Sequence, residues 1–172
     1  DDHIAHESIR QLRTNLRYVN IDKPPSSFIV TSAVPGEGKS TVSLAVARSM
    51  AGSGQPVILI DADLRRPTVA KKLHINAKIG LTQVLAGQVD IAEAVHQVED
   101  SKLFVLPAGR IPPNPSELLG SDKMRQLIEE LSKEFLVIVD APPLLPVTDA
   151  SLLSHAVDLS LIHISEPTRR TP

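Results

Sequence analysis

Short apolar runs alternate with longer amphipathic or alanine-rich stretches along most of the chain. Apolar runs of four to six residues are typical of buried strands, and they cover Ser27–Ser32, Val57–Asp61, Leu103–Leu106 and Leu136–Asp140. Helical periodicity, or a run of good helix formers, predicts helices over Asp2–Tyr18, Lys39 to about Ala51, Asp122–Glu134 and Val147–Ala156. The proline-dense stretch Pro112–Pro115 reads as a rigid surface loop.

This alternation of apolar strands and helices predicts the fold class. Strands that are apolar along their whole length are buried on both faces, which is the pattern of a mainly parallel sheet flanked by helices on both faces. In such α/β folds ligands bind at the carboxyl ends of the strands. We therefore expect the functional residues to follow the strands directly.

Composition narrows the classes of protein that fit. The chain has 172 residues, which predicts about one domain, and its 42% hydrophobic and 22% charged residues argue against disorder. The absence of cysteine excludes disulfides, thiolate metal sites and a cysteine nucleophile. A net charge of −2 and only four aromatic residues give no reason to expect nucleic acid. No apolar run approaches the roughly 18 residues of a membrane helix, and no signal-peptide pattern opens the chain.

The strongest motif lies between the first predicted strand and its helix. Ala33–Thr41 fits the phosphate-loop pattern with alanine in place of the first glycine, which predicts a P-loop NTPase fold. Backbone N–H groups of such a loop surround nucleotide phosphates, a lysine reaches the β- and γ-phosphates, and a hydroxyl binds Mg²⁺. The predicted nucleotide-binding residues are Val34, Pro35, Gly36, Glu37, Gly38, Lys39, Ser40 and Thr41.

Carboxylates stand at the ends of two further predicted strands. Asp140 ends one strand, and Asp61 ends another with Asp63 two residues on. Side chains at alternate positions of an extended chain point the same way, so Asp61 and Asp63 could face one cation. A single aspartate after an apolar run is as often a cap or turn residue. Three of them beside a phosphate loop predict a phosphoryl-transfer site with bound Mg²⁺.

These motifs resemble those of the bacterial tyrosine kinases, or BY-kinases. The resemblance is carried by Ala33–Thr41, Ile58–Pro67 and Leu136–Pro143, which match the Walker A, A′ and B motifs of that family, and by Gly80–Gly87, Leu106–Gly109, Pro112–Leu119 and Asp149–Ala150. The matching pieces recur in order from about residue 7 to residue 158. The resemblance implies an ATP-dependent protein-tyrosine kinase, a transferase that regulates capsular or exopolysaccharide synthesis and export.

The same resemblance implies roles for individual residues. Lys39, Asp61 and Asp63 would be catalytic, and Ser40, Asp61, Asp63 and Asp140 would form the magnesium sphere of MgATP. Arg65 and Arg66 match family positions near phosphate or a subunit boundary, although a solvated basic pair explains them equally well.

The family also implies partners and a location. Glu7, Arg10 and Arg13 match a Glu-x-x-Arg-x-x-Arg helix implicated in assembling rings of kinase domains, although a solvated charged face has the same spacing. We expect a homo-oligomer, tyrosine-rich tails of neighbouring subunits as substrates, and a membrane-embedded polysaccharide chain-length regulator, on the same chain upstream or as a separate protein. The expected location is the cytoplasm, at the inner face of the membrane through that segment or partner.

Two other classes of function compete with the kinase. One is a non-catalytic or weakly hydrolysing P-loop ATPase that gates polysaccharide export, and such a regulator would keep the same phosphate loop and carboxylates. The other is a partitioning or division-positioning ATPase. Those proteins usually carry a signature lysine five places before the phosphate-loop lysine, where this chain has Val34.

The two ends of the chain depart from the family pattern. The sequence begins at Asp1 without methionine and contains one tyrosine, Tyr18, in place of a tyrosine-rich tail. Leu159–Arg169 resembles the in-frame translation of a transposon-end adapter used in sequencing libraries. We therefore expect residues 1–158 to be a kinase domain truncated at both ends, and hypothesise that residues 159–172 are a non-native tail. The composition of Leu159–Ile164 still allows a strand.

Overall fold

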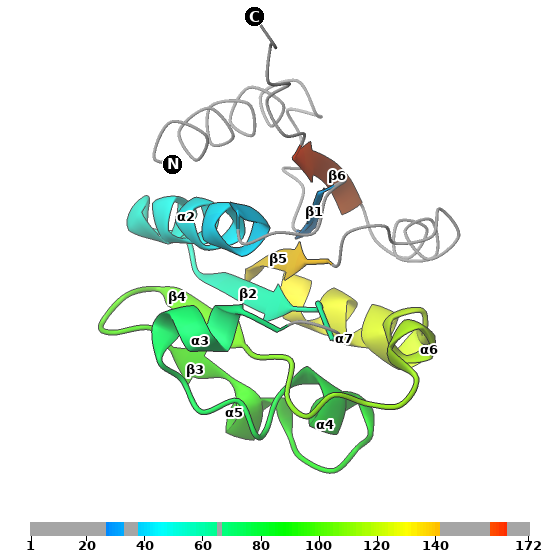
Figure 1. The fold of residues 1–172 in the computed structure, drawn as a ribbon. Coiled ribbons are helices and arrows are strands. Elements are labelled where there is room, and N and C mark those ends of the chain that lie inside the picture. The colour runs from blue at the N-terminus through cyan, green and yellow to red at the C-terminus, as the bar shows by residue number, and fades with distance from the viewer. Residues whose placement is uncertain (1–26, 33–37, 65–66, 142–158, 165–172) are drawn as a thin grey trace, which may run out of the picture.

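The computed structural model describes residues 27–32, 38–64, 67–141 and 159–164 (Figure 1). Its elements in chain order are β1 (Ser27–Ser32), α2 (Gly38–Gly52), β2 (Val57–Asp61), α3 (Val69–Leu73), α4 (Leu81–Leu85), α5 (Ile91–Ala94), β3 (His96–Gln97), β4 (Leu103–Leu106), α6 (Pro115–Leu119), α7 (Asp122–Ser132), β5 (Leu136–Asp140) and β6 (Leu159–Ile164).

The strands form one six-stranded sheet in the order β3-β4-β2-β5-β1-β6. Every neighbouring pair is parallel except β3 with β4, which is antiparallel. The predicted mainly parallel α/β sheet is therefore confirmed. Strand β2 pairs with β5 in a register that sets Val57 beside Leu136 and Asp61 beside Asp140.

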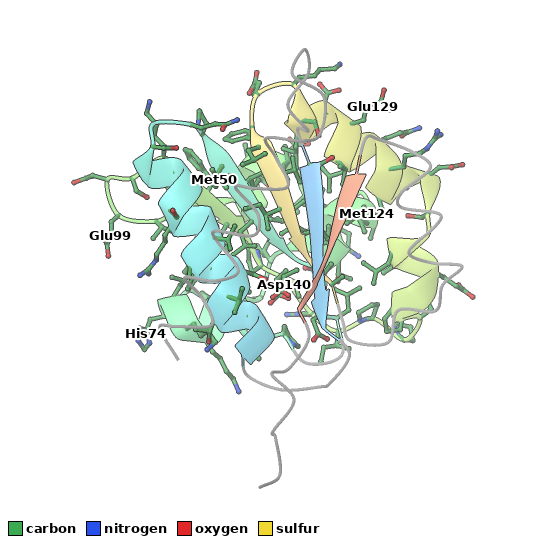
Figure 2. All side chains as sticks on the ribbon, turned by 90° about the horizontal axis from the view of Figure 1, so that it is seen from above. Met50, His74, Glu99, Met124, Glu129 and Asp140 are labelled. Carbon is green, nitrogen blue, oxygen red and sulfur yellow. The ribbon has the colours of Figure 1, made fainter. Side chains whose placement is uncertain are left out.

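Helices cover both faces of the sheet, and alternate residues of β2 point to opposite faces. Ile58 and Ile60 pack in one apolar cluster with the α7 side chains Met124, Ile128 and Leu131. Val57 and Leu59 pack in a second cluster with the α2 side chains Val42, Val46 and Ala47. Figure 2 shows α2 and α7 on opposite sides of the strands. All five residues of β2 and of β5 are buried, which explains their continuous apolar sequence.

The structure confirms the predicted strands at the bounds read from the apolar runs, and it confirms Leu159–Ile164 as a strand beside β1. The helix predicted over Asp122–Glu134 ends at Ser132, because the chain turns there to enter β5, with the Glu134 N–H bonded to the Leu131 carbonyl at 3.2 Å. The short elements α3 to α6 and β3 were not predicted. Helices of four or five residues show too few turns for a period to emerge. The predicted helices Asp2–Tyr18 and Val147–Ala156 lie outside the described residues.

A close backbone contact fixes α4 at the carboxyl end of β4. The Leu81 N–H donates to the Pro107 carbonyl at 2.8 Å, and the Thr82 N–H donates to the Ala108 carbonyl at 3.1 Å. A Cβ atom on Gly80 would lie 2.2 Å from the Pro107 oxygen, so only glycine fits there. Packing between these backbones therefore accounts for Gly80 and Pro107 in two of the stretches that resemble the family, Gly80–Gly87 and Leu106–Gly109.

Candidate nucleotide-binding site

The first turn of α2 meets the carboxyl end of β5 through a buried hydrogen bond. The Ser40 Oγ donates to the Asp140 Oδ2 at 3.0 Å across 100 residues of sequence. Ser40 is 3% exposed and Asp140 is fully buried. Figure 2 shows Asp140 close to the start of α2. The structure thus brings together two of the residues predicted for the magnesium sphere.

Asp61 lies beside this pair. It is the register neighbour of Asp140 on the adjacent strand, and it is also fully buried. Val57 and Leu59 of β2 and Leu136 and Ile138 of β5 pack on the α2 face, so the strand alternation turns both aspartates toward that face. Two carboxylates therefore flank the start of the helix that follows the phosphate loop.

The backbone after β2 holds Asp61 in place. The Asp61 Oδ1 accepts a hydrogen bond from the Asp63 N–H at 3.2 Å, and the Asp61 Oδ2 accepts one from the Val69 N–H at 3.3 Å. Strand β2 ends at Asp61, and Asp63, two residues further on, is 8% exposed.

The oxygen donors at this site match those that commonly bind Mg²⁺ beside a nucleotide. In the part of the chain that the structure describes, no three His, Cys, Asp or Glu side chains are arranged to hold a metal ion. Mg²⁺ in nucleotide sites is commonly bound through one or two carboxylates, with phosphate oxygens and water filling the other positions. Ser40, Asp140 and the neighbouring Asp61 supply such oxygen donors.

Two polar residues that the sequence reasoning missed reach the same place from α3. Thr68, immediately before α3, has its Oγ1 hydrogen-bonded to the Ser40 Oγ. The Lys72 Nζ donates to the Thr41 Oγ1 at 2.6 Å. The spacing of four between Thr68 and Lys72 was the available signal, but it has meaning only once a helix is known there.

The structure describes some of the remaining predicted residues. Gly38 and Lys39 are the first two residues of α2, which is where the phosphate-loop motif places the residues just before Ser40. Val34, Pro35, Gly36 and Glu37 lie outside the described residues, as do Arg65 and Arg66 and the assembly residues Glu7, Arg10 and Arg13.

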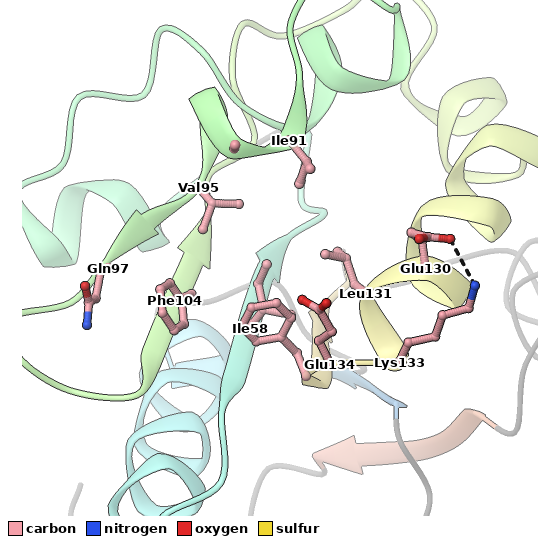
Figure 3. Close-up of a pocket in the computed structure, with 11 residues that line it drawn as sticks. Ile58, Ile91, Val95, Gln97, Phe104, Glu130, Leu131, Lys133 and Glu134 are labelled. Atoms are coloured by element: carbon pink, nitrogen blue, oxygen red, sulfur yellow. Dashed lines mark hydrogen bonds and ion pairs between the residues drawn. The ribbon is translucent and has the colours of Figure 1, made fainter.

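A cavity of about 530 Å³ lies elsewhere in the molecule (Figure 3). Its largely apolar lining includes Ile58 and Phe104, the second residues of β2 and β4, and Phe135, which immediately precedes β5. These residues mark the amino ends of the strands. The cavity is therefore separate from the polar site at their carboxyl ends.

The described helices give no candidate for crossing a membrane, since none combines the necessary length with an apolar composition.

The helix after a phosphate loop and the buried carboxylates at the neighbouring strand ends define a P-loop α/β nucleotide-binding domain. Accordingly, the family described as an AAA domain matches residues 28–167. Tyrosine-protein kinase YwqD of Bacillus subtilis (strain 168) is 42% identical over 160 residues, which cover 92% of this chain and 68% of YwqD. The chain belongs to the bacterial tyrosine kinase family, which confirms the predicted family and enzyme class.

Solved structures agree with this assignment. The kinase domain of the Escherichia coli tyrosine kinase ETK superposes with a TM-score of 0.83 at 36% identity, covering 96% of this chain and 65% of that one. The chimerical protein CapA2B2 also gives a TM-score of 0.83, at 32% identity, with 96% and 73% covered. The chain spans 22% of the curated tyrosine-protein kinase etk of Escherichia coli (strain K12).

The competing partitioning or division-positioning class shares the fold. The cell division ATPase MinD of Pyrococcus furiosus has a TM-score of 0.62 at 24% identity, over 79% of this chain and 58% of that one. An identity this low shows a common architecture, whereas the kinases are both more identical and more completely superposed.

Proposed function

We propose that this chain transfers the γ-phosphoryl group of MgATP to tyrosine hydroxyls. The observation that carries the proposal is the buried hydrogen bond between Ser40 and Asp140, with Asp61 beside it, at the start of the helix that follows the phosphate loop. Hydroxyl and carboxylate oxygens in this position are the groups that P-loop enzymes use around the nucleotide phosphates.

Different residues hold the phosphates and the Mg²⁺ of the nucleotide. Backbone N–H groups of Val34–Thr41 cradle the phosphates, and Lys39 pairs with the β- and γ-phosphates. Ser40 and Asp140, with Asp61 and Asp63 nearby, hold Mg²⁺ directly or through water. When bound, Mg²⁺ neutralises charge on the β- and γ-phosphate oxygens.

Asp61 is proposed as the catalytic carboxylate. Two backbone N–H groups fix its orientation, which suits a group that must accept a proton at a defined place. The tyrosine oxygen forms a bond to the γ-phosphorus as the bond to the ADP oxygen breaks, and the tyrosine proton passes to Asp61. Positioning and charge stabilisation supply most of the catalysis in this class of reaction.

The biological setting follows from the family. We propose that the domain regulates capsular or exopolysaccharide synthesis together with a membrane-embedded chain-length regulator at the inner face of the membrane. Glu7, Arg10 and Arg13 would contact a neighbouring subunit, so that one subunit's tyrosine tail reaches the next subunit's site.

A transfer assay tests the proposal against the non-catalytic regulator. The full chain is incubated with γ-labelled ATP, Mg²⁺ and a tyrosine-rich peptide, since the chain itself contains one tyrosine. We expect labelled phosphotyrosine with the wild type and none with Lys39→Met. Tight ATP binding that Lys39→Met abolishes, without label on the peptide, would instead establish the regulator.

A further inference from the structure

Helix α3 is held firmly beside the start of α2. The Asp61 Oδ2 accepts a hydrogen bond from the N–H of Val69, the first residue of α3. Val69 and Ala70 are buried, and Val69 packs in the same apolar cluster as Val42 and Val46 of α2. The helix ends at Leu73, and the next residue, His74, has a left-handed backbone (φ 53°) and donates its N–H to the Ala70 and Lys71 carbonyls. The backbone of α3 is therefore fixed beside the start of α2.

Two of these side chains contact consecutive residues of the phosphate motif. The Thr68 hydroxyl is hydrogen-bonded to the Ser40 hydroxyl, and the Lys72 ammonium group donates a hydrogen bond to the Thr41 hydroxyl. Because an ionised carboxylate only accepts hydrogen bonds, the Ser40 proton points to Asp140, and Thr68 is the donor to Ser40. The same short segment thus reaches both hydroxyls that close the motif.

The positive charge of Lys72 indicates that this side chain binds an anionic ligand. Among the described residues, no carboxylate forms an ion pair with Lys72, and its ammonium group contacts a neutral hydroxyl. That hydroxyl belongs to Thr41, one of the residues predicted to bind the nucleotide. A lysine in this position adds positive charge beside the phosphate site, where it would attract an anionic ligand.

We propose that Lys72 is a second phosphate-binding lysine, which pairs with the α-phosphate of the bound nucleotide. The inference rests on the proposed function, because it needs the phosphate loop to hold ATP. Lys39 and Ser40 serve the β- and γ-phosphates and their Mg²⁺. Thr41 follows Ser40 in α2, so a cation beside Thr41 binds the α-phosphate, which is the phosphate nearest the nucleoside.

Calorimetric titration of ATP and of ADP into the full chain tests the assignment, with wild type, Lys72→Ala, Lys72→Arg, Lys71→Ala and Lys39→Ala compared. Lys71 is the matched control, because it is an exposed lysine on the same helix and its loss changes the net charge equally. We expect Lys72→Ala to raise Kd roughly five- to twentyfold at low salt, the loss of one charge-assisted contact that is partly screened by solvent. Both nucleotides carry the α-phosphate, so both should lose the same factor, and Lys72→Arg should restore most of it.

The outcomes separate this inference from the proposed function. Should Lys72→Ala match Lys71→Ala while Lys39→Ala still weakens binding, Lys72 has no phosphate role and the proposed function stands. A loss for ATP with none for ADP places Lys72 at the γ-phosphate and overturns the assignment. Normal binding by Lys39→Ala contradicts the proposed nucleotide site itself. The unfolding temperature of each variant, measured without nucleotide, shows whether the variant folds. A variant that loses ATP affinity while keeping the wild-type unfolding temperature supports a direct contact with the nucleotide.

Discussion

Ser40→Ala removes the hydroxyl that joins the start of α2 to Asp140, and α2 offers a matched control for it. Ser40 and Ser43 are both buried in the same helix, at 3% and 0% exposed. Ser40 bonds to a carboxylate, whereas the Ser43 Oγ has no hydrogen-bond partner among the described residues. Replacing each serine with alanine therefore deletes the same atom from two environments that differ mainly in hydrogen bonding.

The magnitudes follow from those environments. A hydrogen bond to a charged group contributes about 1.5–3 kcal/mol, so Ser40→Ala should lower the free energy of unfolding by that amount. For a chain of this size each kcal/mol shifts Tm by about 2–4 °C, which gives a fall of roughly 3–12 °C. Burying an unsatisfied hydroxyl costs about 1–3 kcal/mol, so Ser43→Ala should be neutral or stabilising.

Unfolding is followed by circular dichroism of the full chain, with heat and with urea, in EDTA and without nucleotide. These conditions isolate the protein's own hydrogen bond from any contribution of bound MgATP. Equal losses for Ser40→Ala and Ser43→Ala would refute the reasoning, because the contact with Asp140 would then contribute nothing beyond the buried hydroxyl itself.

Two further predictions concern the scaffold of the site. Gly80→Ala should destabilise the fold by about 1–3 kcal/mol, since its Cβ would overlap the Pro107 carbonyl, whereas Gly52→Ala, with open space around it, should be neutral or slightly stabilising; urea unfolding of both variants measures the difference. Ser121→Ala should cost about 1 kcal/mol, because the Ser121 Oγ accepts the Met124 N–H at 3.3 Å as the N-cap of α7, and an unchanged urea midpoint would contradict that capping role.

The sheet and the strand-end carboxylates could be predicted because their signals are local. Buried parallel strands need continuous apolar runs, so Val57–Asp61 and Leu136–Asp140 show their bounds directly in the sequence. The parallel arrangement then implies that Asp61 and Asp140 end at the same edge, and the observed register confirms this.

The contributions of α3 and α4 could not be predicted in the same way. The contact between Ser40 and Thr68 joins residues 28 apart, and it depends on a five-residue helix whose placement comes from the packing of Val69. Gly80 begins a piece that resembles the family, but its close approach to Pro107 depends on the docking of α4 against the end of β4. Tertiary packing, which no short window of sequence contains, sets both.

The central claim is that Ser40, Asp140 and their neighbours form the magnesium site of a P-loop kinase. Its most direct test is the Kd for ATP, measured by calorimetry with Mg²⁺ and with EDTA, in the wild type and in Asp140→Ala. The account predicts that Mg²⁺ tightens ATP binding by about tenfold or more in the wild type, equivalent to at least about 1.4 kcal/mol, and that Asp140→Ala loses this gain while keeping its affinity in EDTA. An Asp140→Ala protein in which Mg²⁺ tightens ATP binding as strongly as in the wild type would contradict it.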